Sequence, residues 1–264
     1  MRRYCSVLGL AARCTFWKVL AATLVSCGVE AALLFSTLAR WGPERNPLSL
    51  EGLLFHSRAF LCFGPGLVLV CAALAGWGRA GAGSQTGYTV RRLRVGEVRL
   101  SLLWAGYGAA CLVFYWGCHL GTVLALCAAA LPRLAPEAAS PLALFLACWR
   151  APYLHALLPL TDLPLLVRNL LLLTGLGLNT ANCAHQSRHG RRAWAWIPLS
   201  VAGALFFPMP MAAAEWFGSA LSGGPFGLGV GEAERLQSLS LAVASLVLSF
   251  WSVSCIRKGD PDED

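Results

Sequence analysis

Six long apolar runs constrain the fold of this chain more than any other feature. They fall at about residues 19–38, 59–77, 101–125, 163–181, 193–213 and 237–255. Each has close to the roughly 20 residues that a helix needs to cross about 30 Å of hydrocarbon. Hydrophobic residues make up 57% of the chain and charged residues 13%, a balance that excludes a soluble domain. The sequence therefore predicts an all-α, polytopic membrane bundle of six transmembrane helices, forming a single domain over residues 1–264.

The arginines and lysines predict the orientation of these spans. With both termini in the cytoplasm, the inside segments carry fourteen basic residues and the outside segments carry six. This bias follows the positive-inside rule. One further apolar run, residues 141–160, is long enough to be a seventh span, but Arg150, Pro152 and His155 near its middle are costly in lipid. We therefore predict an outer-side helix or helix pair there, which lies on the membrane or dips into it.

The most charged passage of the chain, residues 84–99, lies between the second and third apolar runs. Residues 86–96 can form a short helix, capped at its start by Thr86 and ended by Gly96. One face of this helix is apolar and arginines take the rest, as in a helix at a membrane surface or a knob that docks a soluble partner. The arginines by themselves are also explained by the topology rule and by contact with anionic headgroups.

This passage carries a family resemblance. It reads Y-T-x-R-R-L-x-V-x-E, after the second span and a Gly-rich bend and before the third span, with the motif residues Tyr88, Thr89, Val90, Arg91, Arg92 and Leu93. It resembles the cytoplasmic coupling segment of membrane permeases of export-type ATP-binding-cassette transporters. The resemblance is strongest to the small six-span permease-like proteins of anaerobic gut bacteria, whose YTLRRL segment lies at this place. The stretch EAALLF, which starts at Glu30, also resembles the first span of that family.

The resemblance implies partners and a location. A separately encoded nucleotide-binding ATPase would dock on residues 86–96. The docking residues would be Tyr88, Thr89, Arg91, Arg92, Leu93 and Arg94. The chain would contact membrane lipid and form a homodimer, or a heterodimer with a sister permease, in a bacterial cytoplasmic membrane. The same family implies a re-entrant hairpin in the apolar, Gly-rich connection at residues 216–231.

The sequence lacks the common motifs for chemistry. Neither of the two lysines follows a glycine as in a phosphate-binding loop, so ATP and Mg²⁺ are expected only on a partner subunit. No H-E-x-x-H motif and no pair of span aspartates is present, which argues against an enzyme. The eleven cysteines contain no C-x-x-C pair and we assign the five histidines to different segments, so we predict no metal site or other cofactor. The net charge of +8 indicates topology and anionic lipid rather than nucleic acid.

Polar residues inside the predicted spans form the candidate site, which consists of Glu30, His119, Arg168 and Asn169. An acid in a span costs about 2.5–3.5 kcal/mol and usually faces the bundle interior. At 1.5 Å per residue, Glu30 lies roughly 12 Å below the outer end of its span and the other three roughly 9 Å. We expect a cluster in which Arg168 pairs with Glu30. The alternative is a protonated Glu30 that hydrogen-bonds a nearby hydroxyl and only joins helices.

Two interpretations of function follow. The first is the permease subunit of an ATP-binding-cassette exporter. The alternative is a non-transporting polytopic protein that scaffolds or regulates a membrane complex. Burial of Glu30, His119 and Arg168 against their neighbours, without a path along a dimer interface, would favour the scaffold. A G-x-x-x-G pair in the third span, Gly117 and Gly121, is a candidate for close helix approach.

Overall fold

The computed structural model describes residues 2–40, 49–76, 96–133, 142–191, 193–208 and 230–257. Every regular element in these ranges is helical. The α-helices are α1 (Arg2–Arg40), α2 (Leu50–Ser57), α3 (Phe63–Ala75), α5 (Glu97–Ala130), α6 (Ala143–Arg150), α7 (Pro152–Leu157), α8 (Leu163–Arg188), α9 (Trp196–Phe206) and α11 (Val230–Arg257). Two short 3-10 helices, η1 (Ala59–Cys62) and η2 (Leu131–Arg133), precede α3 and follow α5.

Four helical stretches are long and apolar enough to cross a membrane, and they lie at Ala12–Arg40, Glu97–Arg133, Leu163–Arg188 and Arg235–Arg257. A fifth is present if α2 and the η1–α3 segment, which meet at 45°, count as one span. The predicted all-α class is therefore confirmed for the described residues, with four or five helices able to cross a membrane. The predicted span at 193–213 contains α9, an apolar helix of 11 residues. Residues 209–229 lie outside the described part, and with them most of the predicted hairpin.

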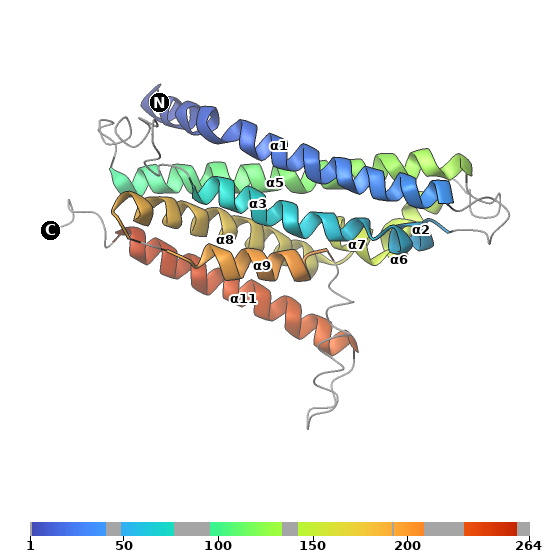
Figure 1. Cartoon of the computed structure of the whole chain (residues 1–264). Helices are drawn as coiled ribbons and strands as arrows, with labels where there is room; N and C mark the ends of the chain where they lie inside the picture. Colours follow the sequence, from blue (N-terminus) through green and yellow to red (C-terminus); the bar gives the residue numbers. More distant parts are fainter. Residues whose placement is uncertain are drawn as a thin grey trace.

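The long helices run alternately up and down one bundle (Figure 1). One end of the bundle, on the left of Figure 1, is called the terminal end below. It contains the first turns of α1 and α5 and the last turns of α8 and α11. Helix α8 is central, because it packs against α5, α11, α3 and α9. Within its apolar stretch 56% of the residues are buried, against 22% in α11, whose outer face carries large exposed apolar side chains as expected for contact with lipid.

The helical stretch that contains the predicted span at 59–77 starts earlier, with α2, and bends by 45° where α2 meets η1. Arg58 ends α2 with a φ of 52°, in the left-handed region. Pro65, in the first turn of α3, has no N–H to donate to the preceding turn. Pro65 therefore cannot donate to the carbonyl of Leu61, four residues before it. In a membrane a carbonyl without its helical donor needs another one.

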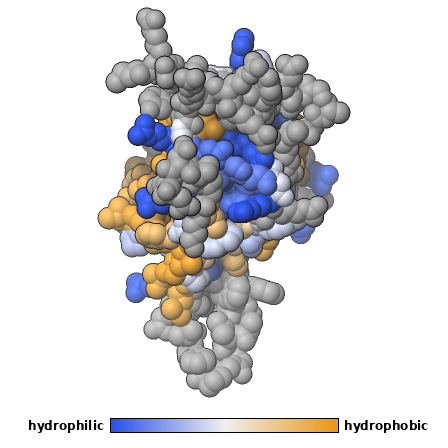
Figure 2. All heavy atoms as spheres, turned by 90° about the vertical axis from the view of Figure 1, so that its left-hand side faces the viewer, coloured by the Kyte–Doolittle hydropathy of each residue, from blue (hydrophilic) through white to orange (hydrophobic). Residues whose placement is uncertain are grey.

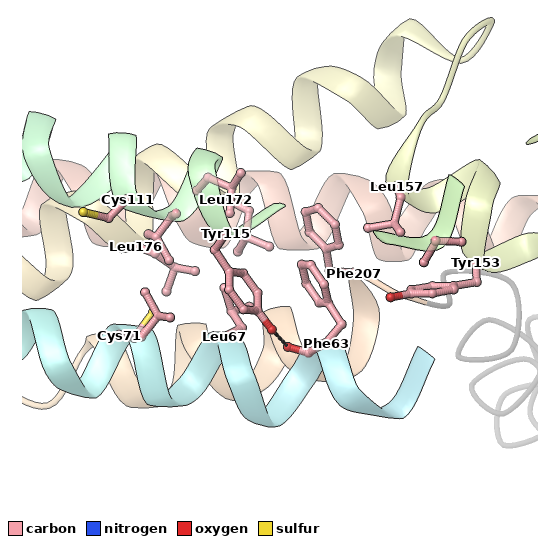
Figure 3. Packing of buried hydrophobic residues seen from close by; sticks show 14 of the residues in the cluster. Phe63, Leu67, Cys71, Cys111, Tyr115, Tyr153, Leu157, Leu172, Leu176 and Phe207 are labelled. Carbon is pink, nitrogen blue, oxygen red and sulfur yellow. Dashed lines mark hydrogen bonds between the residues drawn. The ribbon is translucent and has the colours of Figure 1, made fainter. Parts of the chain in front are cut away.

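Hydroxyl groups from two neighbouring helices bond main-chain carbonyls where η1 meets α3. Ser26 of α1 donates to the carbonyl of Cys62 at 2.9 Å, and Tyr115 of α5 donates to the carbonyl of Phe63 at 2.7 Å (Figure 3). The ring of Phe63 stacks on that of Phe207 with centroids 4.7 Å apart, so the same place is also the aromatic core of the bundle. The break is thus held by α1 and α5 together.

Helices α5 and α8 cross closely because glycines face each other. A Cβ atom added at Gly108 would lie 3.5 Å from the Cα atom of Gly177. A Cβ atom added at Gly177 would lie 2.8 Å from both the carbonyl oxygen of Ala105 and the amide nitrogen of Ala109. Small residues let helix backbones approach in this way in membrane proteins. Gly117 and Gly121, the pair singled out in the sequence, have open space around them within the described chain.

Helix α11 is held against α8 by small polar side chains. The amide of Asn182 donates to the hydroxyl of Ser252 at 3.1 Å, and that hydroxyl donates to the side-chain oxygen of Asn179 at 2.9 Å. Ser245 donates to the carbonyl of Leu171 at 2.7 Å. Lipid tails offer no competing hydrogen bonds, so such contacts favour the association of two apolar helices over their separation in lipid.

Candidate functional site

Glu30 of α1 is the centre of a buried polar group, which we call the Glu30 group. Its carboxyl oxygen Oε2 lies 2.8 Å from Nδ1 of His119 on α5. Its other oxygen, Oε1, accepts a hydrogen bond of 2.6 Å from the hydroxyl of Tyr153 on α7. The exposed fractions of Glu30 and His119 are 0% and that of Tyr153 is 1%. Three helices that are far apart in the sequence therefore meet at one carboxyl group.

The segment at 141–160 delivers Tyr153 to this group. In the structure this segment is the helix pair α6 and α7. The backbone is extended at Ala151, and Pro152 is the first residue of α7, a position where proline is well tolerated. Four of the six residues of α7 are buried in the bundle, namely Tyr153, Leu154, Ala156 and Leu157. The indole N–H of Trp116 on α5 donates to the carbonyl of Leu157 at 3.0 Å and fixes α7 against α5.

Aromatic rings surround the imidazole of His119. The centroid of the Tyr115 ring lies 4.6 Å from the centroid of the imidazole, and that of the Phe63 ring lies 5.3 Å from it; both pairs meet edge to face. Its Nε2 atom has no hydrogen-bond partner among the described residues. The Glu30 group can hold a proton between a carboxylate and an imidazole, and Tyr153 donates to the same carboxyl group. The group is closed to solvent in this conformation, and it joins α1, α5 and α7.

Arg168 and Asn169 form a second group on α8. The guanidinium of Arg168 donates to Oδ1 of Asn169 from Nε at 3.2 Å and from Nη2 at 2.8 Å, and Nη1 donates to Ser238 of α11 at 3.4 Å. The amide of Asn169 donates to the carbonyl of Ala156 on α7 at 2.9 Å. Helix α7 thus touches both groups, with Tyr153 on one and Ala156 on the other.

The predicted ion pair between Arg168 and Glu30 is not present among the described residues. The four predicted residues instead divide into two groups, with α7 between them. The imidazole of His119 and the hydroxyl of Tyr153 contact the carboxyl group of Glu30, where the guanidinium of Arg168 was expected. Tyr153 was not among the predicted site residues, because those residues lie in the predicted spans and residues 141–160 were predicted not to span the membrane.

Replacing Tyr153 with phenylalanine should lower the free energy of unfolding by about 1.5–3 kcal/mol, the usual range for a hydrogen bond to a charged group. The ring stays and only the donor to Glu30 is lost. Unfolding of the purified protein by SDS in mixed detergent micelles, followed by tryptophan fluorescence, measures the change. Tyr107→Phe is the matched control, because the Tyr107 hydroxyl accepts from Thr15 and bonds Cys111, which are both uncharged groups. Equal losses in both variants would contradict a special role for Tyr153.

A third polar group, which we call the terminal group, lies at the terminal end of the bundle. Glu97 is the first residue of α5, His185 lies in the last turn of α8, and His189 caps that helix. The Nε2 atoms of His185 and His189 lie 3.0 Å and 2.7 Å from the same oxygen of Glu97, Oε2. An acid at a helix N-terminus and histidines at a C-terminus both complement the helix dipoles. Figure 2 looks onto this end and shows hydrophilic residues gathered in its centre, with apolar residues at the flank.

The terminal group was not predicted from the sequence, because the five histidines were assigned to different segments. His185 and His189 are in fact only four residues apart, a spacing that places two side chains on one face of a helical turn. That spacing was the available signal. Glu97 could not be joined to it from the sequence, because 88 positions separate it from His185 and only the antiparallel packing of α5 on α8 brings them together.

The predicted docking residues lie outside the described residues. They are Tyr88, Thr89, Arg91, Arg92, Leu93 and Arg94, of the segment 86–96, from which the structure describes Gly96 only. The described chain resumes there at the terminal end, directly before α5. Comparison with protein-family models, with curated proteins and with solved structures finds no match for this chain.

Proposed function

We propose that this chain is the transmembrane permease subunit of an ATP-binding-cassette exporter, in which a separately encoded ATPase docks on residues 86–96. The observation that carries the proposal is the position and length of α5. This helix begins at Glu97, directly after that segment, and runs without a break for 34 residues through the bundle. A push on the segment would therefore reach the interior along one continuous helix.

Helix α5 touches the elements that such a push would have to move. It packs against α1 and α8, and its His119 contacts Glu30 in the middle of the bundle. When the ATPase dimer closes on ATP, residues 86–96 shift and α5 tilts against α8, which changes the bundle between inward-facing and outward-facing states. In this mechanism the permease works as a homodimer or with a sister permease in a bacterial cytoplasmic membrane. ATP and Mg²⁺ bind only to the ATPase.

One observation favours a second function, that of a non-transporting subunit that scaffolds or regulates a membrane complex. Glu30 and His119 are fully buried and Arg168 is 2% exposed, so these polar residues contact neighbouring helices rather than an open face. In a transporter, intramembrane polar residues commonly line the substrate or ion pathway. Under the scaffold function the same residues only fix the positions of α1, α5, α7 and α8.

Arg92→Glu and Leu93→Asp should each release the ATPase subunit during purification of the complex through a tag on this chain. Reversing a charge in a docking contact costs about 2–5 kcal/mol, enough to remove most of the bound ATPase. The measurement is the amount of ATPase that co-purifies, relative to the permease, when both are expressed together. Arg133→Glu is the control, because Arg133 is exposed and lies on η2, at the other end of α5.

The two functions predict different results in this experiment. Loss of ATPase in the segment variants with retention in Arg133→Glu, at unchanged membrane insertion, supports the permease. If no ATPase co-purifies with the wild type, or if both segment variants retain it, residues 86–96 are only a positively charged loop and the scaffold is the better account.

A further inference from the structure

We propose that Glu97, His185 and His189 form a binding site for a divalent transition-metal ion, and for Zn²⁺ in particular. One carboxylate and two imidazoles are a ligand set that Zn²⁺ takes in proteins, with a fourth position left for water. The three ligand atoms lie within 4.8 Å of one another. Two of them come from α8 and the third from α5, so the ion would bridge two helices.

The distances fit an ion after a small opening of the group. Zn²⁺ binds imidazole nitrogen and carboxylate oxygen at about 2.0–2.2 Å, which puts tetrahedral ligands about 3.3 Å apart. The Nε2 atoms of His185 and His189 now lie 3.0 Å and 2.7 Å from Oε2 of Glu97. The two nitrogen–oxygen contacts would open by roughly 0.3–0.6 Å, and the two imidazole nitrogens, which lie within 4.8 Å of each other, would adjust around the ion to make three metal bonds. The side chains already point their ligand atoms at one place.

Exposure at the terminal end gives the ion a way in. The side chains of Glu97 and His189 are 37% and 39% exposed, whereas that of His185 is 1% exposed. His185 therefore anchors the site from inside, and the other two can close over an ion that arrives from solution. The carboxylate of Glu97 supplies a negative charge, and the imidazoles bind in their neutral form.

A second set of potential ligands, Cys27, Glu30 and His119, lies inside the bundle. It is a weaker candidate, because Glu30 and His119 have no solvent exposure and Tyr153 already donates to the carboxyl group. An ion would have to break that bond and cross the packed bundle. The terminal group has neither obstacle, so we assign the site there.

The bridge would fasten the start of α5 to the end of α8. These two helices meet along most of their lengths and form the most extensive helix pair of the bundle. An ion at the terminal group would therefore stabilise the native chain over the unfolded chain, because it binds three residues that only the fold brings together. This effect does not depend on whether the chain transports anything.

Titration of the purified full-length chain with ZnCl₂ tests the site. The chain is purified in detergent through a tag without histidines, stripped of metal with a chelator, and followed by calorimetry and by thermal unfolding. We expect one Zn²⁺ per chain and an increase in the melting temperature. His189→Ala and Glu97→Gln should each weaken binding by about 100-fold or more, because loss of even an outer-shell partner costs about 10- to 100-fold. His56→Ala, a change on α2 at the other end, should bind as the wild type does.

Several outcomes would overturn the site. These are no binding by the wild type, unchanged affinity in both His189→Ala and Glu97→Gln, or loss of binding in Cys27→Ser with retention in His189→Ala. The two terminal variants alter partly exposed side chains, and the melting temperature without metal reports whether each one still folds. A variant that unfolds at the wild-type temperature without metal, yet gains no stability from Zn²⁺, supports the site.

Discussion

Replacing His119 with leucine should lower the free energy of unfolding by about 3–5 kcal/mol, the usual cost of removing one partner from a buried ion pair. Among the residues that the structure describes, Glu30 would keep only the hydroxyl of Tyr153, in a place with no exposure to solvent. Its carboxylate must then stay charged without a counter-charge or take up a proton, and both are costly in an apolar interior. Unfolding by SDS in mixed micelles measures the loss.

A second change separates the effect of charge from the effect of shape. Adding Glu30→Gln to His119→Leu removes the unpaired carboxylate and keeps an acceptor for Tyr153. The double variant should therefore recover most of the lost stability. His155→Leu is the matched control, since His155 is a partly exposed histidine on α7 and its loss leaves the Glu30 group intact. A double variant no more stable than His119→Leu would show that packing, rather than charge, sets the cost.

Replacing Gly177 with alanine should lower the free energy of unfolding by about 1–3 kcal/mol, because overpacking a tight contact forces backbones apart. The added Cβ atom would lie 2.8 Å from main-chain atoms of Ala105 and Ala109, which have no flexible end to move away. Helices α5 and α8 would have to separate, and they form the most extensive helix pair of the bundle. The same unfolding assay applies.

Gly117→Ala on α5 is the control for this change. A Cβ atom there meets nothing within 4 Å, so the substitution should have little effect or be mildly stabilising through helix propensity. Equal destabilisation by both changes would contradict the close crossing. A large loss at Gly117 alone would instead indicate that a partner covers that face, as the G-x-x-x-G spacing first suggested.

The sequence predicted the class of the fold because apolar length is a direct requirement of the bilayer. It also identified Glu30 and His119 as residues that need partners, since polar groups are rare and costly inside spans. It could not say which partner each one takes. The depth of Glu30 in the membrane was compatible with either Arg168 or a hydroxyl as its partner. Which of them it contacts depends on how far each helix is rotated about its axis.

The pairing was decided by α7, whose position the sequence leaves open. Residues 141–160 are apolar enough to enter the bundle and polar enough to remain outside. Pro152 breaks the run into two short helices, and the second is buried by its contacts with α5 and α8. Those two contacts join residues 41 and 13 positions apart. The same limit applies to Gly177, because the spacing of glycines does not say which of them faces a neighbouring helix.

The way the second span is held has a consequence for sequence variation. Ser26 and Tyr115 donate to main-chain carbonyls, which every residue at positions 62 and 63 would supply. The contacts therefore depend on the side chains of Ser26 and Tyr115 but not on those of residues 62 and 63. Position 62 is free to change its side chain over evolution without loss of the contact, whereas the hydroxyls at 26 and 115 have no substitute on the bent helix. Related chains should therefore vary at position 62 and retain the hydroxyls of Ser26 on α1 and Tyr115 on α5.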